Sequence, residues 1–150
     1  MLVGFDSNIL VYAEGLNDPL REERCKRIRA TLGPSQIFLA AQVIGEFYNV
    51  LTRKYQVPRE RARSICQEWR DTCLSSAASE LTFSDAIDLA TDSGLQIWDA
   101  LILATAADAG CAMLLSEDMQ HGFVHRGVTV IDPFAEPAHS LLADALRYRR

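Results

Sequence analysis

Short apolar runs alternate with longer amphipathic segments along the chain, and this alternation predicts its secondary structure. Five apolar segments are expected to form strands, at 2–6, 36–40, near 80–83, 112–116 and 128–132. Helical patterns fill the intervals, at 7–14, 19–32, 41–55, 58–75, 84–92, 98–110 and within the tail 136–150. Strands that alternate with helices indicate an α/β fold, in which helices cover both faces of a central parallel sheet of four to five strands. We expect one domain over residues 1–150.

Three aspartates fall where a parallel sheet places its ligand sites. Ligands bind beyond the carboxyl ends of the strands, near the point where the strand order reverses. Asp6 ends the first strand, Asp118 follows strand 112–116 by two residues, and Asp99 lies in the first turn of the helix after "GLQI". We therefore expect these carboxylates at one edge of the sheet.

A fourth acid, Glu46, lies in the middle of a helix instead of after a strand. Val43 precedes it by three residues and Val50 follows it by four, so its carboxylate lies on or beside the apolar stripe of that helix. A buried carboxylate is costly unless it has a partner, binds a metal or takes up a proton. Glu46 is therefore not a routine solvent-facing residue.

Each of these acids also has an ordinary structural explanation. Asp6 could cap the following helix, and Asp99 could complement the dipole of its own helix. Asp118 could stabilise a turn, and Glu46 could extend to solvent from the edge of its stripe. Four oxygen ligands that share one predicted location instead favour a site for a hard cation, Mg²⁺ or Mn²⁺.

The charge balance limits how such a site would work. A formal net charge of -5 argues against a protein that holds nucleic acid by a bulk positive field alone. Neutralising the four site carboxylates takes this charge from -5 to -1, so a metal-loaded protein need not strongly repel a polyanion. Basic residues gather at one corner between two helices, where they form either a phosphate-contact patch or a solvated surface: Arg53, Lys54, Arg59, Arg61 and Arg63.

The remaining motifs point to ordinary structural roles. The cysteines include no CxxC pair and are expected to be reduced thiols in the cytosol. The sequence has no signal peptide, no membrane-spanning run, no Gly-rich phosphate loop and no G-x-S-x-G motif. Several polar residues are expected on solvated helix faces or in a surface loop: Asp85, Asp88, Asp92, Asp108, His121 and His125. We therefore expect a cytoplasmic protein without membrane contact.

Four ordered segments resemble the PIN-domain ribonucleases, and most of all the VapC-type toxins of toxin–antitoxin pairs. The segments are "FDSNILVYA", "IGEFYNVL" around Glu46, "WDALILATAADAGC" around Asp99 and "LLSEDMQHG" around Asp118. The trailing "VTVIDPF" is similar to the last strand of the family. Each motif is weak alone, but the resemblance spans essentially the whole chain in the right order.

The resemblance implies a PIN-like three-layer sandwich with a divalent-metal site. Asp6, Glu46, Asp99 and Asp118 fall on the acidic positions of the family, and Ser116 with Asp118 matches its Ser/Thr-x-Asp motif. The register favours Asp118 over Glu117 as the ligand. Ser7 and Asn8 match positions beside the first aspartate, so we expect them to support the site. We also expect one of them to cap the following helix and leave Asp6 aimed inward.

The activity implied is Mg²⁺- or Mn²⁺-dependent hydrolysis of RNA, with 5′-phosphate and 3′-hydroxyl products. Of the basic corner, Arg53, Lys54 and Arg59 are the candidate RNA contacts. A toxin of this type also needs an antitoxin, one segment of which would pack near the Glu46 helix and block the metal site. A homodimer is a further expectation from the family.

Two other functions fit parts of the pattern. A non-catalytic PIN-like module that binds RNA or protein would share the fold, but the intact acidic set argues against it. A phosphoacceptor domain of the receiver type also gathers acids at the ends of its strands, but needs a lysine near them. The only lysines are Lys26 and Lys54, and neither follows a strand at that edge.

Overall fold

A computed structural model describes residues 1–147 of the chain. Its strands are β1 (Val3–Phe5), β2 (Ile37–Ala40), β3 (Leu74–Ser76), β4 (Met113–Leu115), β5 (Val124–His125) and β6 (Val128–Ile131). Its α-helices are α1 (Ser7–Ala13), α2 (Pro19–Leu32), α3 (Ala41–Arg53), α4 (Arg59–Thr72), α5 (Glu80–Ser93), α6 (Ile97–Asp108) and α7 (Ser140–Arg147). A 3-10 turn at Pro34–Gln36 leads into β2.

The strands form one sheet in the order β3-β2-β1-β4-β6-β5, parallel except for β5. The chain runs outward from β1 through β2 to β3, and then returns to the other side of β1 to form β4. The strand order therefore reverses between β1 and β4, which makes the carboxyl ends of these two strands the expected ligand position.

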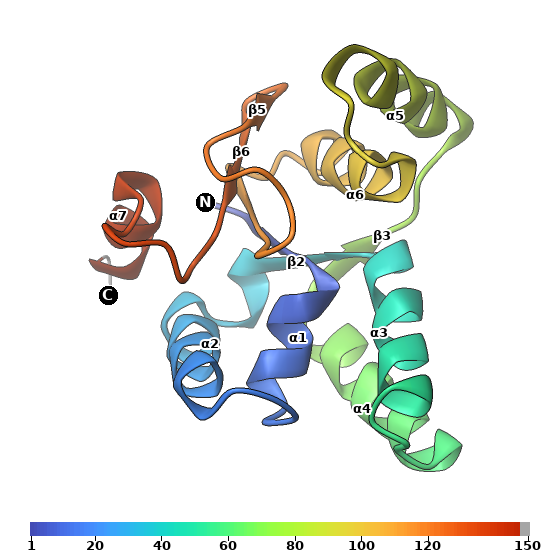
Figure 1. Cartoon of the computed structure of the whole chain (residues 1–150), viewed down its shortest axis with the longest axis vertical. Coiled ribbons are helices and arrows are strands. Elements are labelled where there is room, and N and C mark those ends of the chain that lie inside the picture. Colours follow the sequence, from blue (N-terminus) through green and yellow to red (C-terminus); the bar gives the residue numbers. More distant parts are fainter. Residues whose placement is uncertain (148–150) are drawn as a thin grey trace.

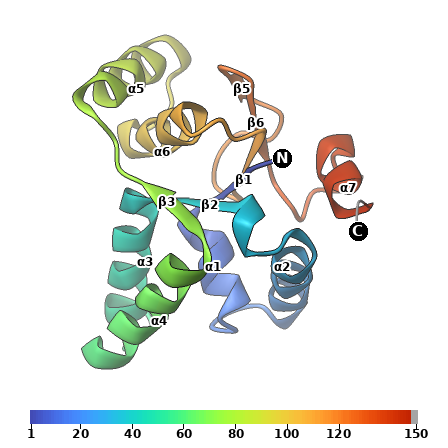
Figure 2. The same cartoon turned by 180° about the vertical axis from the view of Figure 1, so that it is seen from behind.

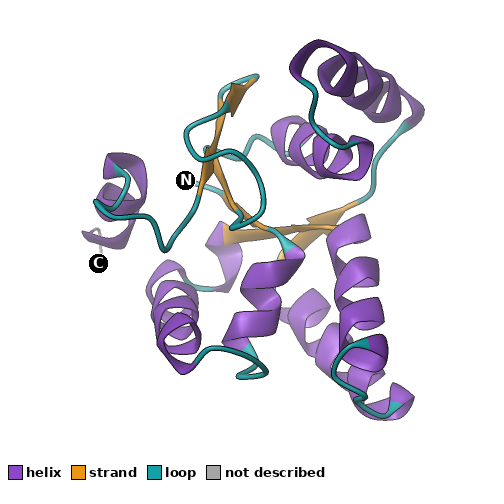
Figure 3. Cartoon of the chain, in the orientation of Figure 1, coloured by secondary structure: helices purple, strands orange, loops and turns teal. Residues whose placement is uncertain are grey.

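Helices cover the sheet on both sides, as Figure 1 and the reverse view in Figure 2 show. Helices α1 to α4 lie on one side of β2 and β3, and the antiparallel pair α5 and α6 lies on the other (Figure 3). Helix α7 lies beside the outer part of the sheet and contacts α2. This arrangement confirms the predicted α/β sandwich of three layers.

The core explains why the inner elements show little polar alternation. All residues of β1, β2 and β4 are buried, as expected for strands covered on both faces. Helix α6 is buried along Ala100–Ala106 without a break, which is typical of a helix enclosed on all sides. Burial on both faces of the sheet holds the carboxyl ends of β1 and β4 in fixed positions relative to each other.

The predicted strand near 80–83 is wrong, and so is the start of the next helix at Ser84. Helix α5 already begins at Glu80, because Ser79 and Thr82 form a reciprocal capping box. The fifth parallel strand is instead β3, whose three residues are all exposed at the edge of the sheet. The parallel part of the sheet thus has five strands, as expected, and the two-residue strand β5 adds a sixth strand that is antiparallel.

The outer parts of the fold bear on two further predictions. Helix α7 occupies 140–147 of the predicted tail helix, and residues 148–150 lie outside the described part of the chain. No helix within residues 1–147 is both long and apolar enough to cross a membrane. All four cysteines are free thiols, and burial raises the pKa of Cys25 and Cys111 to about 12.

Candidate active site

Asp6 lies at the point where the strand order reverses. Its backbone N–H donates to the carbonyl oxygen of Leu115 at 2.9 Å, so it continues the pairing of β1 with β4 by one residue. It is also the N-cap of α1, because its Oδ1 accepts the N–H of Ser7 at 2.7 Å. The expectation that Ser7 or Asn8 would cap this helix is therefore wrong. The Asp6 carboxylate therefore caps α1 and is also one of the four acids of the predicted site (the acidic set: Asp6, Glu46, Asp99 and Asp118).

Ser116 binds the other oxygen of the same carboxylate from the end of β4. Its hydroxyl donates to Oδ2 of Asp6 at 2.8 Å, and both residues are buried. The Ser116 oxygen in turn accepts the backbone N–H groups of Asp118 at 3.2 Å and Met119 at 3.4 Å. These two acceptor bonds fix the direction of the hydroxyl proton, so Ser116 holds Asp6 and shapes the loop that carries Asp118.

The environment of Asp6 disfavours its charge despite these two donors. Only 4% of the residue is exposed, and burial raises its pKa to about 6. The hydrogen bonds from Ser116 and Ser7 oppose this shift, whereas the negative charges of Asp99 and Asp118 add to it. Asp6 therefore keeps its proton to a higher pH than an exposed aspartate when nothing positive is bound.

Glu46 and Asp99 reach the same region from α3 and α6. Partial burial raises the pKa of Glu46, an amide hydrogen bond from Gln42 at 2.9 Å lowers it, and the charge of Asp6 raises it further. Partial burial also raises the pKa of Asp99, and the charges of Glu46 and Asp118 add to the effect. The charges of the four acids therefore act on one another, although Asp6 and Asp118 are 112 positions apart in the sequence.

Asp118 lies on the exposed side of this acidic set. Its Oδ2 accepts the side-chain amide of Asn8 at 3.1 Å, and Asn8 Oδ1 accepts the backbone N–H of Glu117 at 3.3 Å. Glu117 lines the same cavity as Asp118, but its carboxylate has other partners: Tyr12 donates to one of its oxygens and Arg21 lies 3.2 Å from the other. The structure thus leaves the Asp118 carboxylate in the acidic set and pairs the Glu117 carboxylate with other residues.

Two glutamines near the acids were missed in the sequence. Gln96 is the N-cap of α6, and its Oε1 accepts the backbone N–H of Asp99 at 3.0 Å. Gln42 lies one turn before Glu46 and binds it, while its own Oε1 is buried and has no hydrogen-bond partner among the described residues. The spacing of four residues between Gln42 and Glu46 was the available signal.

The acidic side chains are too far apart in this structure to coordinate one metal ion together. Within residues 1–147, no group of three or more His, Cys, Asp or Glu side chains is close enough to hold a metal ion. The set is nevertheless close enough for mutual repulsion to raise the pKa values of Asp6, Glu46 and Asp99. A cation that bound here would therefore relieve this repulsion as the side chains closed around it.

The candidate RNA contacts separate into two surfaces. Lys54 lines a cavity of about 270 Å³ together with Asp118 of the acidic set and its partner Asn8. Arg53 and Arg59 instead line a different hollow, between the end of α3 and the start of α4. The structure thus brings only one of the three cations next to the acids.

Some acids and one histidine outside the site were assigned wrongly. Asp85 is half-buried and pairs with His125 at 3.1 Å and with Arg126 at 2.8 Å, and Arg126 also pairs with Asp108 at 2.9 Å. Asp85 and Asp108 are therefore not simply solvated, and His125 is not a free loop residue. This network joins the β5–β6 turn to α5 and α6, away from the acidic set.

Comparison with known families and proteins identifies the group to which this arrangement belongs. The PIN domain family model matches residues 4–124, which contain every acid of the set. The chain belongs to the PIN-domain family. One PIN-domain relative, "Ribonuclease VapC7" of Mycobacterium tuberculosis, is 32% identical over 148 residues, covering 95% of this chain and 99% of the relative.

Solved PIN-domain structures share the fold at lower sequence identity. A toxin–antitoxin complex from Klebsiella pneumoniae matches with a TM-score of 0.66 at 22% identity, covering 88% of this chain and 98% of that one. VapC20 of Mycobacterium tuberculosis, described as a sarcin-ricin loop cleaving toxin, matches with a TM-score of 0.64 at 16% identity, covering 77% and 89%. At such identities these matches support the PIN-domain fold.

Proposed function

We propose that this PIN domain is a divalent-metal-dependent endoribonuclease and the toxin of a toxin–antitoxin pair. The observation that carries the proposal is the convergence of Asp6, Glu46, Asp99 and Asp118 at the reversal of the strand order. Membership in the PIN-domain family and the likeness to a VapC ribonuclease over nearly the whole chain support it.

The donor set fits Mg²⁺ or Mn²⁺, because it consists of carboxylate oxygens without a thiolate or imidazole. Asp6, Asp99 and Asp118 are the proposed ligands, directly or through water, and Glu46 either binds the metal or orients the attacking water. The unpartnered Oε1 of Gln42, next to Glu46, is an acceptor available for a water of the hydrated ion. The chemistry of the residues therefore supports a hard cation.

A divalent cation, when bound, lowers the pKa of a water molecule and offsets the charge of the reacting phosphate. The residues of this chain supply the positioning. Ser116 and the Ser7 N–H hold both oxygens of Asp6, Asn8 holds Asp118, and Gln96 fixes the start of α6 near Asp99. Because the pKa values of Asp6, Glu46 and Asp99 are raised, protons compete with the cation for these oxygens, so activity is expected to fall at acidic pH.

Incubation of the purified protein with a structured cellular RNA, with and without Mg²⁺ or Mn²⁺, tests the function. We expect internal cleavage that depends on the cation and leaves 5′-phosphate and 3′-hydroxyl ends. Absence of both cation binding and cleavage would favour the alternative function, a non-catalytic PIN-like binding module.

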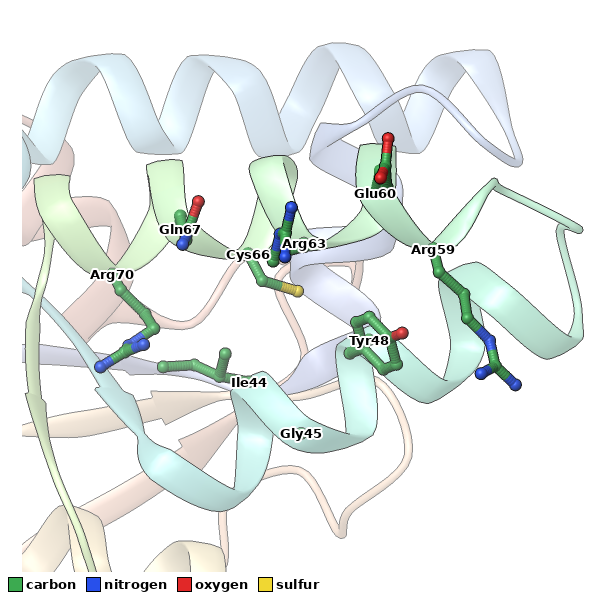
Figure 4. A pocket seen from close by; sticks show the side chains of 9 residues that line it. All are labelled: Ile44, Gly45, Tyr48, Arg59, Glu60, Arg63, Cys66, Gln67 and Arg70. Carbon is green, nitrogen blue, oxygen red and sulfur yellow. The ribbon is translucent and has the colours of Figure 1, made fainter.

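We further propose that an antitoxin docks on the groove between α3 and α4, which has a volume of about 490 Å³. Figure 4 shows Ile44 and Tyr48 on the α3 side, and Cys66 among the arginines of α4. Arg59, Arg63 and Arg70 line this groove, and none of them forms an ion pair within the described part of the chain. An apolar floor under unpaired cations suits an acidic amphipathic segment.

Reversing one groove charge should weaken such a partner. We expect Arg63→Glu to lower antitoxin affinity at least about tenfold, because a charge that attracts an acidic segment is replaced by one that repels it. Arg61→Glu is the matched control, since Arg61 is exposed on the same helix but does not line the groove. Calorimetry with a purified cognate antitoxin measures both. Equal losses for the two variants would place the antitoxin elsewhere.

The homodimer expected from the family has one apolar candidate surface on α5. Phe83 and Ile87 lie one turn apart there and are 41% and 55% exposed. We expect light scattering to give twice the 16.7 kDa mass of one chain, and Ile87→Glu to shift the protein toward the monomer. Asp88→Lys, which changes an exposed neighbour, should leave the dimer intact. A wild-type protein that is monomeric at micromolar concentration would contradict this expectation.

A further inference from the structure

We infer that the cavity between α1 and α3 is a nucleotide subsite, in which Lys54 binds an RNA phosphate that flanks the scissile one. This inference rests on the proposed ribonuclease function. It assigns a direction in which the RNA leaves the acidic set. It also gives Lys54 a role that differs from those of the other basic residues at this corner.

The cavity is continuous with the acidic set. Asn8 and Asp118, which bind each other, line this cavity together with Lys54 and Tyr55, and Asn17 and Glu117 line it as well. Ser7, Val11 and Tyr12 contribute from α1, and Val50 contributes from α3. An RNA strand that is cleaved at the acids can therefore extend into this cavity, between α1 and α3.

The helix geometry sets the spacing along this route. Glu46, Val50 and Lys54 follow one another at intervals of four residues, so they share one ridge of α3 and its end. Lys54 lies eight residues beyond Glu46, which corresponds to about 12 Å along the helix axis. Lys54 and Glu46 thus lie about two turns apart on the same ridge, a spacing at which the lysine can bind a phosphate that neighbours the one held at the acids.

Lys54 is available for a phosphate. It forms no ion pair with the residues that the structure describes, and its only recorded partner is the ring of Tyr55, 5.4 Å away. By contrast, the chain's other lysine, Lys26, pairs with Glu22 one turn earlier in α2. The acids near Lys54 do not compete for it, since Glu117 is bound by Tyr12 and Arg21 and Asp118 by Asn8.

Tyr55 adds an aromatic surface to the same cavity. Its hydroxyl oxygen accepts the side-chain amide of Asn17 at 2.9 Å, which ties the ring to the loop between α1 and α2. A positively charged group beside a fixed aromatic ring is the arrangement by which proteins hold single-stranded nucleic acid. The cavity volume of about 270 Å³ suits one nucleotide unit better than a folded protein segment.

The test compares Lys54→Ala with Lys26→Ala, so that one lysine of the chain controls for the other. Binding of a fluorescent single-stranded RNA is measured by anisotropy over a range of salt concentrations, in an Asp99→Asn background that prevents cleavage. We expect Lys54→Ala to weaken binding roughly three- to tenfold and to reduce the salt slope by about 0.7, as for the loss of one phosphate contact. Lys26→Ala should change neither quantity.

Kinetics on the cleavage-competent protein provide a second readout. Lys54→Ala should raise KM and leave kcat nearly unchanged, because it removes binding that is equal in the ground and transition states. Tyr55→Leu should weaken RNA binding roughly tenfold through the loss of stacking. Unchanged melting temperatures would show that both variants are folded.

The outcomes separate this inference from the proposed function. If the wild-type protein cleaves RNA but Lys54→Ala keeps its RNA affinity, salt slope and KM, the subsite is wrong and the function stands. If the wild-type protein neither binds nor cleaves RNA, both fail. If Lys54→Ala instead lowers only the affinity for the antitoxin, the cavity belongs to a protein partner and the inference is overturned.

Discussion

Asp6→Asn is expected to reduce RNA cleavage by at least roughly 100-fold, because a neutral amide is a poor ligand for a hard cation. Asp99→Asn should have a similar effect from the other side of the cluster. Asp88→Asn, which alters an exposed acid of α5, is the control and should leave cleavage unchanged. Gel analysis of a 5′-labelled RNA with Mg²⁺ or Mn²⁺ measures all three. Undiminished cleavage by both site variants would falsify the site assignment.

Asp6→Asn should change the free energy of unfolding little, so its loss of activity will not reflect unfolding. Ionising Asp6 in the folded protein costs about 3 kcal/mol at neutral pH, since burial raises its pKa from 3.8 to about 6. An asparagine removes this cost. It also faces two donors, the Ser7 N–H and the Ser116 hydroxyl, with only one acceptor oxygen, and an unmatched buried donor costs about 1–3 kcal/mol. The two effects nearly cancel.

Removal of divalent cations with EDTA is expected to abolish cleavage and to expose the repulsion within the acidic set. The raised pKa of Asp6 means that the folded protein holds more protons than the unfolded chain between about pH 4 and 6. The free energy of unfolding of the metal-free protein should therefore fall as the pH rises through this range, and the penalty is fully present above it. Glu46 and Asp99 shift in the same direction.

Added Mn²⁺ should restore this stability, and more so at higher pH. At a concentration about 100 times its dissociation constant, a ligand stabilises the folded state by about 2.7 kcal/mol, which corresponds to several degrees in Tm. We expect a larger Tm increase at pH 7.5 than at pH 5.5, because protons compete for the same oxygens. The Asp6→Asn/Asp99→Asn double variant is the control and should show no increase. An equal increase at both pH values would contradict metal binding at these acids.

The buried part of the fold could be predicted from the sequence because its residues carry a strong local pattern. The strands β1, β2, β4 and β6 appear as apolar runs, and α6 as an uninterrupted apolar helix. Edge strands lack such a pattern: Leu74, Ser75 and Ser76 of β3 are all exposed, and β5 has only two residues. The apolar Leu81 and Phe83 suggested a strand instead, but they project from α5 into solvent.

Asp6 and Asp118 could be expected near each other because the sheet topology brings the ends of β1 and β4 together. Their hydrogen-bond partners depend on side-chain directions that no local pattern encodes. Asp6 therefore turned out to cap α1 itself, although Ser7 or Asn8 was expected to do so. Asp85 and Asp108 looked like solvated acids until the β5–β6 turn brought Arg126 between them.

The bond between Asp6 and Ser116 joins residues that are 110 positions apart, and this separation has a consequence for the folding of the protein. Helices α1 to α6 and strands β2 and β3 lie between these two residues in the sequence. Non-local contacts of this kind form late in folding, since the intervening chain must first be ordered. The acidic set is therefore expected to be complete only after β4 and the loop that carries Asp118 have docked beside β1.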